Sequence, residues 1–411
     1  MAARLLRWFA VLGTGIALTG FNPQLALARV LTVGPAGEFR VPSAAAKAAR
    51  DGDTIEIAAG TYTGDAAVWR QNAITIRGVG GRPVLDAAGK SAEGKAIWVI
   101  KGDNVVIDNI AFVGARVSDR NGAGIRHEGG RLTIRNSLFR DNENGILTKN
   151  DRDQSLVIEG SEFADNGIAG GSGQVHAIYA GSIRELSVRS SYFHGTKIGH
   201  HIKSRAQTTT VLCNYIVDGP DGTASFEVDI SIGGDALIMG NVMHKGFHAD
   251  NTGMIAYGNE GLKNEGRSLI VLNNTLVTDV GSGVFVRIGK KARPMSAHIS
   301  NNIFIGKAAL AEGTEITEPN LYAESIDGSG DGALGSIAGA IGPVADPGFI
   351  DAANGDFRLA AGSPAIDAGT VNAAIDGERV VPDCEYVHPA SERPRPSVGE
   401  IDLGSYEYEG S

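Results

Sequence analysis

The 411-residue sequence has only two cysteines, and aromatic residues make up 6% of it. The core that its 42% of hydrophobic residues can build must therefore be mainly aliphatic, not based on large rings. Cations are also in deficit, because 37 Lys and Arg stand against 47 Asp and Glu and leave a net charge of −10. An acidic chain lacks the general attraction to phosphate that drives nucleic-acid binding, so nucleic acid is not an expected partner.

Glycine, in contrast, is abundant. The chain has 57 glycines in 411 residues, close to twice the usual share of about 7%. This excess indicates many tight turns, and the hydrophobic content rules out both disorder and a collagen-like chain.

The first 28 residues are typical of a secretory signal peptide. Arg4 and Arg7 precede an apolar run from Trp8 to Phe21, and Ala26 to Ala28 supply a small-residue cleavage pattern. We expect cleavage after Ala28, a secreted or periplasmic location and no transmembrane segment in the mature chain; an uncleaved anchor is the alternative. In an oxidising compartment, Cys213 and Cys384 could form a disulfide or remain two free thiols.

The rest of the chain is organised as a repeat. In eight segments, alternating aliphatic residues lead to a small or amide residue and, three positions later, to a large apolar residue. These segments are Val105–Phe112, Leu132–Phe139, Leu156–Phe163, Leu186–Phe193, Thr210–Val217, Ala236–Met243, Leu269–Leu276 and Ala297–Phe304. Their ends lie 24 to 33 residues apart, a period that no helix fits.

A second short strand lies between successive repeats, as in Gly145-Ile-Leu-Thr148 and His201-Ile-Lys-Ser204. Such strands cannot bury a face alone, but stacked coils would form parallel sheets around a continuous core. Asn109, Asn136, Asn214, Asn273 and Asn301 recur near one turn, where asparagine tolerates left-handed backbone and can bond the next coil. The pattern predicts an all-β solenoid of about ten coils, with an antiparallel sandwich as the weaker alternative.

Two segments carry a family resemblance. Asp51-Gly-Asp-Thr-Ile-Glu-Ile-Ala-Ala-Gly-Thr-Tyr62, after a predicted capping helix over 43–50, resembles the first coil of right-handed parallel β-helix proteins of the pectate-lyase-like superfamily. Asp346-Pro-Gly-Phe349 and Ser363-Pro-Ala-Ile-Asp-Ala-Gly369 resemble the C-terminal module that follows bacterial secreted β-helices. The resemblance implies a β-helix over 29–307, a loop and linker over 308–344 and a C-terminal module over 345–411, packed on the helix. It leaves activity open, because this superfamily contains lyases, hydrolases, epimerases and noncatalytic proteins.

Chemistry is expected on the outer faces of the coils. In each second strand, one aliphatic residue is expected to face inward, so its neighbours in the strand face outward. The inward residues are Ile125, Ile146, Ile178, Ile202, Val228, Ile255 and Val284. The aligned coils then present candidate catalytic residues Lys203, Arg205, His201, His200 and Tyr179. Candidate substrate-binding residues are Lys149, His176, Glu227, Asp229 and Arg287.

A polysaccharide lyase or uronate epimerase is the leading hypothesis. β-Elimination of a uronic acid needs a base for the proton beside the carboxylate, cations for the enolate-like charge and an acid at the leaving oxygen, roles that Lys203, Arg205 and His201 could fill. Glu227 and Asp229 could hold a Ca²⁺ ion, the one cofactor considered. A solvated charge ladder, with Lys203 and Arg205 paired to Glu227 and Asp229, is the alternative without chemistry.

Further alternatives remain. A glycoside hydrolase could use Glu227 and Asp229 as its two carboxyl groups. His194, Asp218 and His244 would share a column if the coils align on Phe193, and could bind a metal. A noncatalytic exopolysaccharide-binding or surface β-helix is the third class. In each case a polysaccharide is the expected partner of a monomeric chain.

Overall fold

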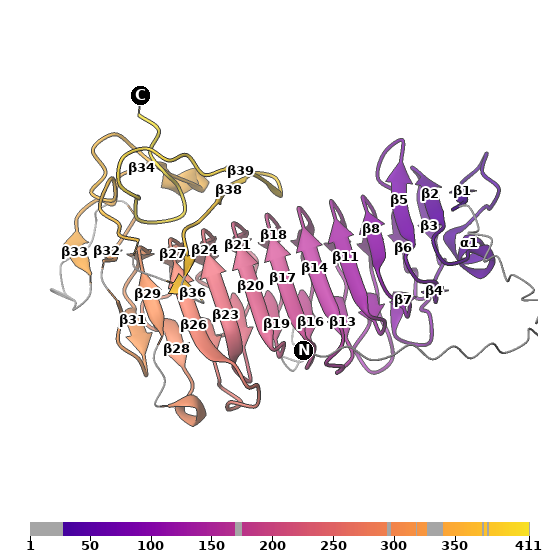
Figure 1. Cartoon of the computed structure of the whole chain (residues 1–411), viewed down its shortest axis with the longest axis horizontal. Helices are drawn as coiled ribbons and strands as arrows, with labels where there is room; N and C mark the ends of the chain where they lie inside the picture. Colours follow the sequence, from indigo (N-terminus) through magenta and orange to yellow (C-terminus); the bar gives the residue numbers. More distant parts are fainter. Residues whose placement is uncertain are drawn as a thin grey trace, which may run out of the picture.

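The computed structural model describes residues 28–168, 175–293, 297–317, 319–326, 340–371, 374–375 and 378–410. Residues 1–27 of the expected signal peptide lie outside the described residues. Short strands follow one another around successive coils, and each pairs in parallel with strands of the coils before and after it (Figure 1). The chain is therefore an all-β solenoid, and the alternative of an antiparallel sandwich is wrong.

Three parallel sheets, here called A, B and C, form its sides. Sheet A consists of β1 (Val30–Val33), β2 (Thr54–Ala58), β5 (Thr75–Val79), β8 (Val105–Asp108), β11 (Arg131–Arg135), β14 (Ser155–Glu159), β17 (Glu185–Arg189), β20 (Thr208–Leu212), β23 (Gly234–Met239), β26 (Arg267–Leu272) and β29 (His298–Ser300). Sheet B consists of β3 (Thr61–Thr63), β6 (Val84–Asp86), β9 (Ala111–Val113), β12 (Leu138–Arg140), β15 (Glu162–Ala164), β18 (Tyr192–His194), β21 (Tyr215–Val217), β24 (Val242–Lys245), β27 (Thr275–Thr278), β30 (Ile303–Ile305), β32 (Leu321–Ala323) and β33 (Ile341–Val344). Sheet C consists of β4 (Ala67–Trp69), β7 (Ala96–Ile100), β10 (Ala123–His127), β13 (Asn144–Thr148), β16 (Ile178–Ala180), β19 (Ile202–Ser204), β22 (Val228–Ile230), β25 (Gly253–Tyr257), β28 (Val284–Ile288) and β31 (Ala309–Glu312).

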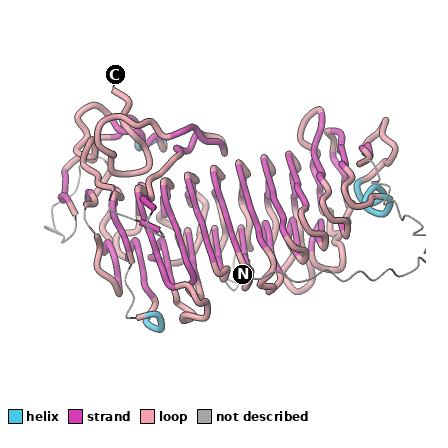
Figure 2. The backbone as a smooth tube through the Cα atoms, viewed as in Figure 1, coloured by secondary structure: helices cyan, strands magenta, loops and turns pink. Residues whose placement is uncertain are grey.

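The alternation of residue types sets which side chains enter the core. In β2, Ile55 and Ile57 are buried while the residues beside them are half-buried, as a period of two requires. Figure 2 shows the resulting stack of strands, with short helices only toward its two ends. Inside sheet B, the rings of Phe112, Phe139 and Phe163 continue to that of Phe193, with centroids 4.7 to 5.0 Å apart and planes within 8° of parallel. Because neighbouring coils are about 4.8 Å apart, the four rings can stack on one another in a continuous column.

The register differs from the predicted one in two coils. Phe193 pairs with Ile216 and not with Val217, and Ile255 pairs with Val286 and not with Val284. The other five inward residues of sheet C align as expected. Both errors arise where turn lengths change, because the pattern of hydrophobic residues alone does not fix the number of turn residues between strands.

The turn between sheets A and B carries a ladder of buried amides. Asn109, Asn136, Asn273 and Asn301 have positive φ, as expected, but Asn214 lies one position later and Cys213 takes the left-handed place with φ 51°. Asn214 instead opens a column that continues through Asn241, Asn274, Asn302 and Asn320. Along it each side-chain amide donates to the carbonyl oxygen of the next asparagine at 2.9 to 3.0 Å.

We expect Asn241→Ala to lower the free energy of unfolding by about 3 kcal/mol, because it leaves buried donors and acceptors unpaired. The Asn241 amide donates to the Val211 and Met239 carbonyls and to Asn274, and its oxygen accepts from the backbone of Asn214. Urea denaturation would measure the change. Gln207→Ala, which removes an exposed amide in the same region, is the control and should change stability by less than about 0.5 kcal/mol.

A helix covers one end of the solenoid, and further strands extend the other end. Helix α1 (Pro42–Ala48) lies at the first coil and buries Ala45 and Ala46 against the core. The described residues of the predicted linker over 308–344 contribute β31, β32 and β33 to sheets C and B, so the solenoid continues beyond residue 307. Residues 318 and 327–339 of this stretch lie outside the described residues. The Gly, Ala and Ser content of the stretch suggested a loop, but in these three strands pairing with the preceding coil satisfies the backbone.

The C-terminal residues pack on the outer face of sheet B. They contain β34 (Phe349–Asp351), η2 (Ala352–Asn354), β35 (Asp356–Leu359), β36 (Ala374–Ile375), β37 (Glu378–Arg379), β38 (Cys384–Val387) and β39 (Ser391–Pro394), and η1 (Lys290–Ala292) precedes them. Phe357 and Leu403 are buried in one apolar cluster with Val242, Val277 and Ile303. A disulfide between Cys213 and Cys384 ties β38 to the body. No helix among the described residues is long and apolar enough to span a membrane.

Candidate functional site

The outer face of sheet C brings together Tyr179, Lys203 and Asp229. These residues lie directly opposite one another on β16, β19 and β22, where adjacent strands are about 4.8 Å apart. Each follows a buried aliphatic residue, for example Ile202 before Lys203, so the period of two turns it outward. The sequence therefore placed these three side chains on the correct face.

Ion pairs connect the cluster across coils. Lys203 Nζ lies 3.5 Å from Asp229 Oδ2 and 3.3 Å from Glu260 Oε1. Arg205 donates to both carboxylate oxygens of Glu260 at 2.7 Å and to the Tyr179 hydroxyl. Part of the predicted charge ladder is thus present, but Arg205 pairs with Glu260 and not with Glu227. The sequence analysis missed Glu260 because it lies in the loop after β25, outside the strand pattern.

The pKa values of the two carboxyl groups in this cluster are shifted in opposite directions. Desolvation raises the pKa of Asp229, an effect that the Lys203 ammonium partly offsets. The pKa of Glu260 is lowered, because its bonds to Arg205 and the charge of Lys203 outweigh its own desolvation. Glu260 therefore stays ionised and pairs with both Lys203 and Arg205, whereas Asp229 is protonated more easily.

Two histidines border the cluster. The rings of His176 and His200 stack with centroids 4.8 Å apart, and His200 Nε2 lies 3.5 Å from Asp229 Oδ2. In each ring Nδ1 accepts a backbone N–H, from His200 and from Phe226 respectively. A neutral ring must then carry its proton on Nε2. Burial lowers the pKa of His176 well below 6.5 and that of His200 to about 3, so both are neutral hydrogen-bonding groups and not cations.

We expect the free energy of unfolding to decrease as the pH falls from 6.5 toward about 3, because the unfolded chain binds protons that buried His200 does not. Denaturation curves at a series of pH values would measure this dependence, and His200→Gln should flatten it. His248→Gln, at an exposed histidine, is the control and should leave the slope unchanged. A slope that His200→Gln does not alter would show that His200 is protonated in the folded protein.

His201 and Glu227 do not lie on the outer face, contrary to expectation. Both are completely buried, and they point into the solenoid where the chain bends into strands β19 and β22. These strands begin only at Ile202 and Val228, so the alternation does not extend back to the preceding residue. As a result His201 and Ile202 are both buried, although they are adjacent in sequence.

Inside the solenoid these two residues form part of a buried ionic cluster. His201 Nε2 lies 3.1 Å from Asp218 Oδ1, and Lys245 Nζ lies 3.2 Å from Glu227 Oε1. Burial raises the pKa of Glu227 to about 8 despite the Lys245 charge. The expected catalytic role of His201 and the expected role of Glu227 in substrate binding are therefore wrong.

The same geometry removes two further expectations. Glu227 and Asp229 point to opposite sides of their strand, so they neither form the expected Ca²⁺ site nor serve as the paired carboxyl groups of a hydrolase. The predicted column of His194, Asp218 and His244 is also wrong, because Val217 pairs between the two histidines. His194 contacts Glu162 and His244 contacts Asp279, each at 3.0 Å.

The remaining candidates extend the site along sheet C. Arg287 lies in the column of Lys203 and Asp229, two strands beyond Asp229, and pairs with Glu312 at 3.1 Å. Lys149 follows β13, on the other side of β16, and pairs with Asp151 at 3.0 Å. From Tyr179 to Arg287 the column spans four coil spacings, or about 19 Å. This length suits an extended polymer better than a small molecule.

Comparisons with known proteins address the fold. No protein-family model matches the sequence, and the curated proteins include no significant match. The crystal structure of the pectate lyase Pel9A aligns with 93% of this chain and 97% of its own, with 15% identity and a TM-score of 0.57. That of an alginate lyase from Paenibacillus sp. str. FPU-7 aligns with 72% of this chain and 97% of its own, with 18% identity and a TM-score of 0.39.

The protein is thus a parallel β-helix of the pectate-lyase-like fold. At 15% identity the likeness concerns the fold, and the chemistry has to be argued from the side chains on sheet C.

Proposed function

We propose that the protein is a lyase that cleaves a uronate-containing polysaccharide by β-elimination on the outer face of sheet C. The observation that carries this proposal is the convergence of the Tyr179 phenol with two cations, Lys203 and Arg205, on the outer face of sheet C, in a column about 19 Å long. The fold, which is that of a pectate lyase, supports the same class of reaction.

Each group has a role in the proposed reaction. Tyr179, as a phenolate whose negative charge the Arg205 guanidinium stabilises, takes the proton from the carbon beside the uronate carboxylate and becomes a neutral phenol. Lys203, held between Asp229 and Glu260, neutralises the carboxylate and the enolate-like charge. The bond from the neighbouring carbon to the glycosidic oxygen then breaks, a carbon–carbon double bond forms, and the leaving oxygen takes up the proton that Tyr179 accepted.

This assignment changes the part expected of Lys203. A lysine beside another cation would suit a base, but the Lys203 ammonium contacts two carboxylates, which stabilise positive charge. Tyr179, whose hydroxyl accepts from Arg205, is the better placed proton acceptor. Arg287 and Lys149, farther along the face, would contact other carboxylates of the same polymer.

We expect the mature protein to release products with the ultraviolet absorbance of an unsaturated uronate from at least one of pectate, alginate and other anionic polysaccharides. Tyr179→Phe should lower the rate roughly 10²-fold to 10⁴-fold, and Lys203→Ala roughly 10²-fold to 10³-fold. Lys263→Ala, at an exposed lysine off the sheet, is the matched control and should leave the rate unchanged. Absence of such products from every polymer would reject the lyase proposal.

We also propose that the protein is exported and loses residues 1–28, because of its basic and apolar N-terminal sequence. The Cys213–Cys384 disulfide agrees with an oxidising compartment. N-terminal sequencing of protein from the periplasm or the medium should find Arg29 first. Recovery of the full-length chain from the cytoplasm alone would contradict export.

A further inference from the structure

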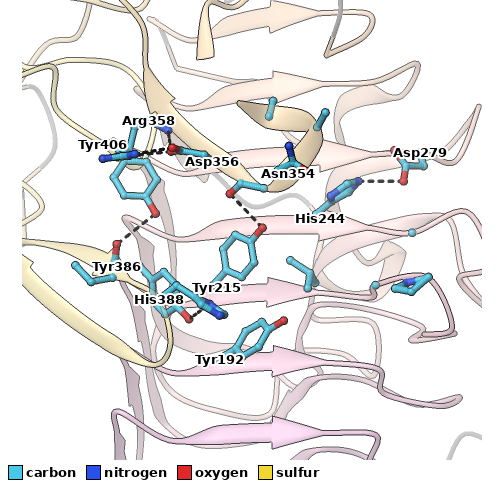
Figure 3. Close-up of a pocket in the computed structure, with 18 of the residues that line it drawn as sticks. Tyr192, Tyr215, His244, Asp279, Asn354, Asp356, Arg358, Tyr386, His388 and Tyr406 are labelled. Carbon is cyan, nitrogen blue, oxygen red and sulfur yellow. Dashed lines mark hydrogen bonds and ion pairs between the residues drawn. The ribbon is translucent and has the colours of Figure 1, made fainter. Parts of the chain in front are cut away.

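A second concave site lies on sheet B, under the C-terminal residues. It has a volume of about 1090 Å³, slightly above the range of roughly 300–1,000 Å³ that small-molecule sites occupy. Its floor is the outer face of β18, β21 and β24, and its walls come from η2, β35 and the β38–β39 hairpin (Figure 3). None of the residues predicted for the lyase site lines it.

Aromatic rings form one side of this cavity. Tyr215 stacks on Tyr386 with centroids 5.4 Å apart and planes 14° from parallel, and Tyr192 lies 5.8 Å from Tyr215. The His388 ring meets Tyr192 edge-on at 5.0 Å. Tyr192 and Tyr215 remain half-buried, and Phe247 at the rim is 75% exposed. Together these rings form an aromatic surface that the strand pattern of the sequence did not predict.

Polar groups lie among the rings in fixed positions. Asp356 and Arg358 pair at 2.6 Å, and His244 bonds Asp279 at 3.0 Å. Burial raises the pKa of Tyr215 to about 12, so its phenol stays neutral; its hydroxyl donates to the Gly355 carbonyl at 3.4 Å and can accept a hydrogen bond. Within the described residues, the Tyr192 hydroxyl bonds to no protein group, which leaves it free for a ligand.

The walls of the cavity are held in place without a ligand. The Cys213–Cys384 disulfide anchors β38, and a buried pair between Arg395 and Glu407 at 2.9 Å fastens the segment that follows β39. Below the cavity, Phe357 packs into the apolar cluster on sheet B. A simple packing interface would close over such rings, whereas this one leaves them open.

We propose that the cavity is a saccharide-binding site, separate from the reaction site on sheet C, that holds pyranose rings against Tyr192 and Tyr215. Sugar rings have apolar C–H faces that suit aromatic surfaces and hydroxyl edges that suit fixed polar groups. The four charged residues that line the cavity, Asp279, Asp356, Arg358 and Arg393, cancel in charge, so recognition depends on ring faces and hydroxyls and not on uronate charge.

The cavity lies on the same coils as the proposed reaction site. Its floor strands β18 and β21 belong to the same coils as β19 and β22, which carry Lys203 and Asp229. Two loops that line the cavity connect sheet B to sheet C: the loop with Gly219 joins β21 to β22, and the loop with Phe247 joins β24 to β25 in the next coil. A saccharide held here keeps the protein on a polysaccharide while the neighbouring face remains accessible. The inference does not depend on the lyase proposal.

Calorimetric titration of the mature Lys203→Ala protein tests the site, because this background prevents consumption of the probe. The probes are a galacturonate hexasaccharide, which is acidic, and cellohexaose, which is neutral. We expect at least one to bind. Tyr192→Ala, which removes a ring, and Ala353→Trp, which fills the cavity from the exposed η2 helix, should each weaken that binding at least about tenfold.

Ala361→Trp is the matched control, because it adds a ring at an exposed position of the C-terminal region outside the cavity, and it should bind like its parent. Binding that both cavity variants retain, or the absence of binding by either probe, would overturn the inference. Loss of lyase activity toward all polymers with retained binding would reject only the proposed reaction on sheet C.

Discussion

Parallel hydrogen bonding between successive coils is the constraint on which the rest of this structure depends. Since each coil lies about 4.8 Å from the next, every side-chain position repeats as a column along the solenoid. Each column must then contain groups that tolerate close repetition. Phenylalanine rings satisfy this by stacking, as from Phe112 to Phe193, and asparagines by donating from one amide to the next, as from Asn214 to Asn320.

The interior column of large rings ends at Phe193, and the composition of the core changes there. Ile216 is smaller than the ring before it, and buried His201 and Glu227 lie in the same part of the core. Ionisable side chains cost free energy when they are buried without a partner, and Asp218 and Lys245 are the partners of these two residues. The coils that carry charge inside are also those that present Lys203 and Asp229 outside.

Two surfaces of these coils are therefore specialised. Sheet C presents a cluster of charged groups on its outer face, which suits a charged polymer and proton transfer. Sheet B presents tyrosine rings under a covalently anchored C-terminal region, which suits neutral ring faces. Both sites rest on the same coils, so a change in the register of one coil would displace both sites together.

The fold and part of the sheet C site could be predicted from the sequence, because both depend on local alternation. The aliphatic pattern predicted the stacked coils, and the residue after each inward aliphatic placed Tyr179, Lys203 and Asp229 on one outer face. Bends and loops lie outside that pattern. His201 is one residue before its strand and points inward, while Glu260 reaches the site from a loop.

The sequence by itself thus determined the parallel solenoid and the outer column of sheet C, since a period of two needs only neighbouring residues. The tertiary structure alone decided three other features: the Cys213–Cys384 link, the buried pair of Glu227 and Lys245, and the cavity beside Tyr215. Each of these joins residues from different turns or from the distant C-terminal segment. The contacts depend on how turns of unequal length place the coils, which no local periodicity encodes.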